Sequence, residues 1–194
     1  EANISCFTPL STAGCNITLS ASASPICQGD SIELLAEGYV VSTPLSNDFN
    51  SSTIGTGWNS TVNARFDNPC GPGLDGTPHL WMGVEPSPRT LQSNAYDVSL
   101  GGTISFDFKM ATQGNASPCE GPDEADEGVY LQYSTSGGTT WNTIHYFYPP
   151  FYTDGSSHAL AWQNYQFSIP PVAQTANTSF RWIQNEISSN STDH

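Results

Sequence analysis

The chain has 194 residues, of which 18 are acidic and 4 are basic, so its formal net charge is −14. So few cations exclude a surface that follows nucleic-acid phosphates, and the same argument excludes binding to an anionic membrane surface. No segment approaches the ~20 consecutive apolar residues of a membrane span, so we expect no membrane insertion.

The chain opens at Glu1 directly into polar sequence, without the apolar stretch of a signal peptide. Such a chain is either cytosolic or a mature chain whose signal has been removed. The composition and the cysteines favour the second alternative, so we expect an extracellular or cell-surface protein.

The first 43 residues differ from the rest in composition. Residues 1–28 are rich in Ser, Ala, Thr and Cys, with one short alternating piece at Asn16–Ser20. A strand is predicted at Ser31–Tyr39, because Ile32 and Leu34 fall on one face. We interpret residues 1–43 as an N-terminal extension or a partial immunoglobulin-like module, and residues 44–194 as the main domain.

The main domain contains many short extended segments separated by turn signals, and no convincing amphipathic helix. This pattern predicts an all-β antiparallel sandwich, and the number of strands favours the jelly-roll type. The expected extended segments are Trp58–Val62, His79–Gly83, Arg89–Ser93, Thr103–Met110, Val129–Ser134, Trp141–Phe147, Trp162–Ser168 and Thr178–Gln184.

Two of these segments carry the clearest patterns. In Thr103–Met110 the even-numbered residues are apolar and face one way, while Asp107 and Lys109 face the other way and can pair. In Glu127–Trp141 an alternating strand runs into Gly137-Gly138, which supplies the positive φ angles of a tight hairpin turn. Thr103–Met110 is therefore the cleanest predicted strand, and the other segments can be placed relative to the hairpin.

Five cysteines are present, and none has the CxxC spacing of a zinc or thioredoxin site. In an exported chain they are expected to form disulfides, and the odd number leaves one thiol free or paired beyond this chain. We favour a disulfide between Cys70 and Cys119 in the main domain. Two of the remaining three can pair near the N-terminus, and the sequence does not choose among Cys6, Cys15 and Cys27.

An acidic loop, Glu120–Glu127, holds five carboxylates just before the hairpin. Ca²⁺ prefers six to eight oxygen ligands, which such a loop can supply. The loop does not follow the EF-hand pattern, since Ala125 stands where a ligand is required. The alternative interpretation is a solvated acidic loop without a metal.

Aromatic residues gather in Tyr146–Tyr152, and such residues can stack on sugar rings. We identify Tyr146, Tyr148, Phe151 and Tyr152 as the candidate ligand-binding residues. The alternative is that this loop packs its own aromatics over the edge of the sandwich.

Catalytic motifs are missing from the sequence: it has no Gly-x-Ser-x-Gly elbow, no phosphate-binding loop and no HExxH. Some jelly rolls hydrolyse glycans with paired carboxylates, and Asp107 is a conceivable member of such a pair. An ion pair with Lys109 explains Asp107 more simply, and we predict that the protein is not an enzyme.

Several segments then follow one another in the order of a known family. They are Asn47-Asp48-Phe49, Trp58, Cys70-Gly71, His79–Gly83, Ile104–Phe108, Glu127–Ser134 with Gly137-Gly138 and Trp141, Phe180-Arg181-Trp182, and Asp193-His194. From about residue 47 to residue 194 the chain resembles the jelly-roll subdomain of reelin-type repeats. The hairpin and the Phe-Arg-Trp segment are the most specific parts of this resemblance.

The resemblance implies several features of the main domain. It fits a disulfide between Cys70 and Cys119, and it implies a structural Ca²⁺ near Asp48 and Asp193. Together with Glu127 from the acidic loop, these residues are the candidate calcium ligands. The family pattern continues past Asp-His into a Trp-x-x-Asp-Asn-Val strand, so we expect the last strand to be missing from residues 44–194.

The N-terminal part has a second resemblance. Residues Ser24–Gly38 are similar to the opening of immunoglobulin-like modules in the giant surface adhesins of gliding flavobacteria, the SprB type, which the type 9 secretion system can export. Together the two resemblances imply a non-catalytic adhesin module for attachment or gliding motility. Its expected partners are a surface polysaccharide or another cell-surface protein, together with the export and gliding machinery. The alternative is a carbohydrate-binding, lectin-like domain of a secreted protein or enzyme.

Overall fold

The computed structural model describes residues 17–21, 34–38, 45–84, 88–111, 116, 119, 121–122, 124–149 and 161–185. The chain divides into two compact units, Glu1–Pro44 and Leu45–His194. In the first unit, β1 (Ile17–Ala21) pairs with β2 (Leu34–Gly38) in an antiparallel hairpin that sets Ile17 opposite Gly38. The second unit contains the other elements and all the side chains discussed below.

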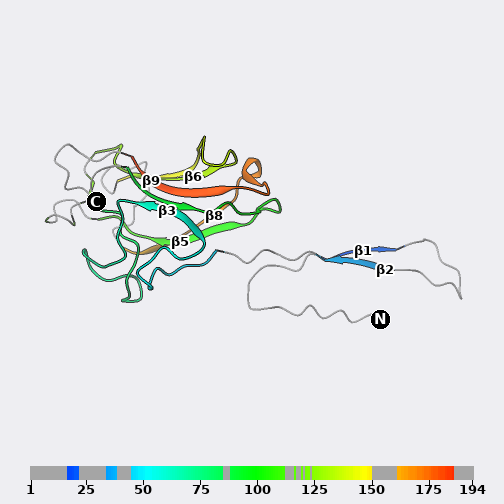
Figure 1. The fold of residues 1–194 in the computed structure, drawn as a ribbon, viewed down its shortest axis with the longest axis horizontal. Coiled ribbons are helices and arrows are strands. Elements are labelled where there is room, and N and C mark those ends of the chain that lie inside the picture. The colour runs from blue at the N-terminus through cyan, green and yellow to red at the C-terminus, as the bar shows by residue number, and fades with distance from the viewer. Residues whose placement is uncertain are drawn as a thin grey trace, which may run out of the picture. The chain divides into compact units, whose positions relative to one another are not determined.

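The second unit is built from two antiparallel sheets. The larger sheet has the order β3 (Trp58–Val62), β4 (Arg89–Ser93), β9 (Ser179–Gln184), β6 (Val129–Ser134) and β7 (Asn142–Phe147). The smaller sheet pairs β5 (Thr103–Phe108) with β8 (Gln163–Ser168), and a single 3₁₀ turn, Pro171–Ala173, lies between β8 and β9. In Figure 1, β6 and β9 lie on one side of this unit and β5 and β8 on the other.

The strands of the second unit pair in a nested order. β4 pairs with β9, β5 with β8, and β6 with β7. This is the pairing of one long hairpin folded over on itself, so that successive pairs fall alternately in the two sheets. The unit is therefore an antiparallel β-sandwich with jelly-roll winding, as the sequence predicts.

The core lies between the two sheets and is largely aromatic. Phe106 from β5 contacts Trp182 of β9 with ring centroids 5.1 Å apart, and Phe147 of β7 at 5.9 Å. Leu131, which is 0 % exposed, packs in the same cluster. The even-numbered residues of β5 point inward, which confirms the predicted alternation of that strand.

One expected strand is reduced to a single bridge. His79–Gly83 reads as a compact strand, but only Trp81 bridges, to Arg65. Trp81 and Arg65 exchange two backbone hydrogen bonds, both of 2.8 Å, and the Trp81 indole lies against Gly83, where an added Cβ would be 2.1 Å from the ring. Asp107 also differs from its predicted pairing: it accepts a hydrogen bond from Asn164 Nδ2 on β8 at 3.2 Å.

No α-helix occurs in the part of the chain that the structure describes. Accordingly, no helix among those residues is long and apolar enough to cross a membrane.

Candidate binding face

The predicted aromatic loop begins at the end of β7, and its first tyrosine is used within the protein. Tyr146 Oη donates a hydrogen bond to the carbonyl oxygen of Ala125 at 2.8 Å and accepts one from the amide of Gly128 at 2.9 Å. Burial raises the pKa of Tyr146 to about 12, and the nearby Tyr130 contributes further to this rise. The Tyr146 hydroxyl thus fastens the segment before β6 to β7.

Three tyrosine rings form one cluster at this edge of the sheet, with Tyr146 tilted against Tyr130 and edge-on to Tyr148. The Tyr146 ring lies 4.3 Å from Tyr130 and 4.6 Å from Tyr148, measured between ring centroids. Both Tyr146 and Tyr148 are half-buried. The other two predicted ligand-binding residues, Phe151 and Tyr152, lie outside the described residues.

Glu127 stands in a buried polar cluster at the end of the sandwich. Its Oε2 accepts a hydrogen bond from the Glu124 amide at 2.9 Å, and its carbonyl oxygen accepts one from Gln184 Nε2 at 2.6 Å. Gln184 Oε1 in turn accepts a hydrogen bond from Arg89 Nη1 at 2.9 Å. Arg89 and Glu127 are 0 % and 1 % exposed, so this cluster is part of the interior.

The calcium candidates are not gathered into one site by the described residues. Asp48 is exposed, and its carboxylate accepts two hydrogen bonds from Asn50, from the amide and from Nδ2, both at 3.1 Å. In the described part of the chain, no group of three or more His, Cys, Asp and Glu side chains is placed to hold a metal ion. Asp193 lies outside the described residues, so calcium binding stays a prediction, which a calcium titration of the melting temperature would test.

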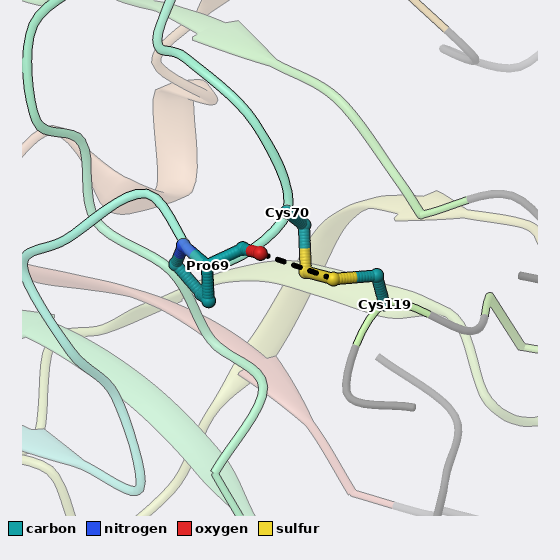
Figure 2. The surroundings of a disulfide bond; sticks show 3 residues. All are labelled: Pro69, Cys70 and Cys119. Carbon is teal, nitrogen blue, oxygen red and sulfur yellow. Dashed lines mark hydrogen bonds between the residues drawn. A yellow bond between two sulfur atoms is a disulfide. The ribbon is translucent and has the colours of Figure 1, made fainter. Parts of the chain in front are cut away.

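The disulfide joins two loops of the sandwich unit. Cys70 and Cys119 are bonded with their Cα atoms 5.3 Å apart, across 49 residues of sequence. Cys119 Sγ lies 3.4 Å from the Pro69 carbonyl oxygen, as Figure 2 shows. The bond therefore fixes the segment before β6 to the loop that follows β3. Cys6, Cys15 and Cys27 lie outside the described residues.

A row of residues crosses the outward face of the larger sheet. The sequence patterns do not reveal this row. The strand registers align Ser60, Gln92, Arg181, Gln132 and Thr143 from β3 to β7, and we call these five residues the outward row. They alternate with core residues such as Leu91 and Leu131, which places the row on the face away from the core. Each residue becomes part of the row only through strand pairing.

Arg181 is at the centre of the outward row and is held in place by two contacts. Its Nε donates a hydrogen bond to Gln132 Oε1 at 2.8 Å, and its guanidinium stacks 4.2 Å from the centroid of the Trp141 ring. Gln132 Nε2 also donates to Thr143 Oγ1 at 3.2 Å. Partial burial lowers the pKa of Arg181, yet an arginine stays charged at neutral pH.

Trp141 itself is positioned by the hairpin turn. Its Nε1 donates a hydrogen bond to the Gly138 carbonyl oxygen at 3.0 Å. Ser134 Oγ accepts hydrogen bonds from the amides of Ser136 and Gly138, which closes the turn from inside. The turn therefore holds the indole over the sheet.

One comparison with known proteins identifies a family. A family model described as Reelin subrepeat B matches residues 64–194, about two thirds of the chain. The match covers strands β4 to β9, the disulfide and four of the five residues of the outward row.

Proposed function

Because the chain belongs to the family of reelin subrepeat B domains through residues 64–194, we propose that it is a non-catalytic adhesion module of an extracellular, cell-surface protein. The family match is the observation that carries this proposal. The disulfide supports it, because such bonds persist in oxidising compartments outside the cytosol.

A role in attachment or gliding motility is the finer part of the proposal. It rests on the resemblance of residues Ser24–Gly38 to gliding adhesins of the SprB type. The partner would be a surface polysaccharide or another cell-surface protein, and attachment to the outer membrane would run through other parts of the polypeptide or through partners.

Asp107 is the carboxylate considered above for glycan hydrolysis, and its neighbour on the paired strand is an amide. Asp107 projects from the exposed side of β5, and its cross-strand partner is Asn164. A glycosidase requires a second carboxylate at a defined distance, and an amide does not provide the acid or base. The hydrogen bond from Asn164 gives Asp107 a structural role between β5 and β8.

Adhesion of particles coated with the whole chain tests the proposal. Beads carrying the chain should adhere to surfaces coated with bacterial or host polysaccharide, or to cells, under flow that removes beads carrying a β-sandwich of similar size and charge. Equal removal of both kinds of bead from every surface would contradict the proposal. Release of reducing sugar from the same polysaccharides would contradict its non-catalytic part.

A further inference from the structure

We propose that the outward face of the larger sheet, centred on Arg181, binds the carboxylate of an acidic saccharide. This inference rests on the proposed adhesive function and names its ligand. It places the ligand on the sheet face, away from the aromatic loop that the sequence suggests.

Arg181 offers a preorganised pair of donors. Its Nε already donates a hydrogen bond to Gln132, and the plane of its guanidinium is held against the Trp141 ring. Among the residues that the structure describes, no hydrogen bond or ion pair engages Nη1 or Nη2 of Arg181. Those two nitrogens form the end of the guanidinium fork, which matches the two oxygens of a carboxylate.

The two rows of side chains nearest Arg181 on the sheet contain no carboxylate, although the chain is strongly acidic. Two adjacent rows cross the outward face of the sheet, and none of their members is Asp or Glu. The first is the outward row itself, and the second is Val62, Thr90, Ile183, Tyr130 and Tyr146. More distant acidic residues are screened by salt beyond roughly 10 Å, so a single carboxylate is attracted locally.

The neighbouring side chains favour a saccharide over other anions. Amide and hydroxyl groups of Gln92, Gln132 and Thr143 stand on strands of one sheet, whose neighbouring strands are about 4.8 Å apart, beside an aromatic ring. Sugars present hydroxyl groups and an apolar ring face together, which such a surface complements. A polyphosphate or nucleic acid would need several cations, and the two rows contain one.

Binding of galacturonic acid oligomers to the whole chain tests this inference. The matched ligand is the same oligomer with its carboxylates reduced to alcohols, which keeps the size and most hydroxyl groups. We expect the acidic oligomer to bind at least tenfold more tightly. In NMR spectra, its addition should shift the Trp141 indole and Arg181 Nε signals.

Two substitutions of Arg181 and one control substitution distinguish binding at this site from nonspecific attraction by positive charge. Arg181→Gln should weaken binding of the acidic oligomer at least tenfold, and Arg181→Lys should weaken it too, because lysine lacks the planar fork. Lys109→Gln removes the same charge just after β5 of the smaller sheet, and should leave the affinity unchanged. Thermal melting establishes that each variant is folded.

Each other outcome overturns the inference. Unchanged binding by Arg181→Gln, or equal loss in Lys109→Gln, would reject Arg181 as the binding group. Equal affinity for the reduced oligomer would reject the carboxylate, and full competition by polyglutamate would reject a saccharide ligand. If bead adhesion persists in any of these cases, the adhesive function stands without this site. If the Arg181 variants unfold, the NMR titration of the wild-type chain is the deciding test. Shifts of signals other than Trp141 and Arg181, or no shifts at all, would then reject the inference.

Discussion

The Tyr146 hydroxyl makes two hydrogen bonds, and both partners are main-chain groups of the segment before β6. Replacing this tyrosine by phenylalanine keeps the ring contact with Tyr130 and removes only the oxygen. We expect Tyr146→Phe to lower the free energy of unfolding by about 1–3 kcal/mol, because Ala125 and Gly128 lose their partner. Urea denaturation at neutral pH measures this change.

The matched control is Tyr165→Phe on β8. Its hydroxyl donates to Gln163 Oε1 at 3.1 Å in an exposed position, where water replaces the lost partner. The expected change is below roughly 0.5 kcal/mol. Equal effects of the two substitutions would show that the Tyr146 hydroxyl does not hold the loop.

The same hydroxyl predicts a dependence of stability on alkaline pH. The pKa of Tyr146 is raised from 10.0 to about 12 in the folded protein, so the unfolded chain loses this proton first as the pH rises. The contribution of Tyr146 is therefore complete below pH 10 and is lost as the pH rises from 10 to 12. The denaturation midpoint should fall over this range.

Tyr146→Phe should make that alkaline fall shallower. Burial also raises the pKa of Tyr96 and Tyr165, so the fall should not disappear. A curve for the variant that runs parallel to the wild type from pH 10 to 12 would contradict the assignment to Tyr146.

Two glycines near β6 and β7 differ in what a side chain would meet. Gly137 has φ +66° and an added Cβ there would have no atom within 4 Å, whereas a Cβ on Gly128 would lie 2.2 Å from the Phe147 carbonyl oxygen. We expect Gly137→Ala to cost about 1 kcal/mol of backbone strain. Gly128→Ala should cost about 3 kcal/mol, because it pushes the loop off β7.

Urea denaturation of both variants measures this ordering. The turn rule alone would predict the opposite order, since Gly137 is the turn residue with positive φ. A larger loss for Gly137→Ala would mean that the close approach of Gly128 to Phe147 relaxes at little cost.

At the level of elements, local pattern and local chemistry carry the successful predictions. The alternation in Thr103–Phe108 and the positive φ angles of Gly137 and Gly138 depend on neighbouring residues, and both are confirmed. The prediction of a tight turn is itself wrong, because residues 135–141 lie between β6 and β7. The prediction of a strand at His79–Gly83 is wrong because this segment pairs only through the single bridge between Trp81 and Arg65, and strand pairing is a tertiary event that hydrophobicity does not encode.

At the level of the whole molecule, the outward row shows why the candidate site is not found from sequence. Gln92, Arg181 and Gln132 become neighbours only when β4, β9 and β6 pair, and these strands are far apart in the chain. A one-residue shift of register would turn Arg181 inward. The local signal is limited to Trp141 after the turn and Arg181 between two aromatics, and both of these features also fit a purely structural role in the fold.

The disulfide acts on the whole sandwich because it closes a long loop. Cys70 and Cys119 are separated by 49 residues, a span that contains β4 and β5. Closing a loop of this length restricts the unfolded chain, and the chain-entropy model gives about 4 kcal/mol for it. We expect Cys70→Ser with Cys119→Ser to lower the free energy of unfolding by about 2–4 kcal/mol.

The background for this test is a chain in which Cys6, Cys15 and Cys27 are replaced by serine, so that no other thiol can exchange with the pair. Urea denaturation of this background, oxidised and reduced, should reproduce the difference given by the double substitution. Because the effect lies mainly in the unfolded chain, both folded forms should keep the same Arg181 and Trp141 NMR signals. A double variant as stable as the oxidised background would mean that sheet packing alone holds the two loops together. A folded but altered spectrum would mean that the bond also shapes the native sheet face.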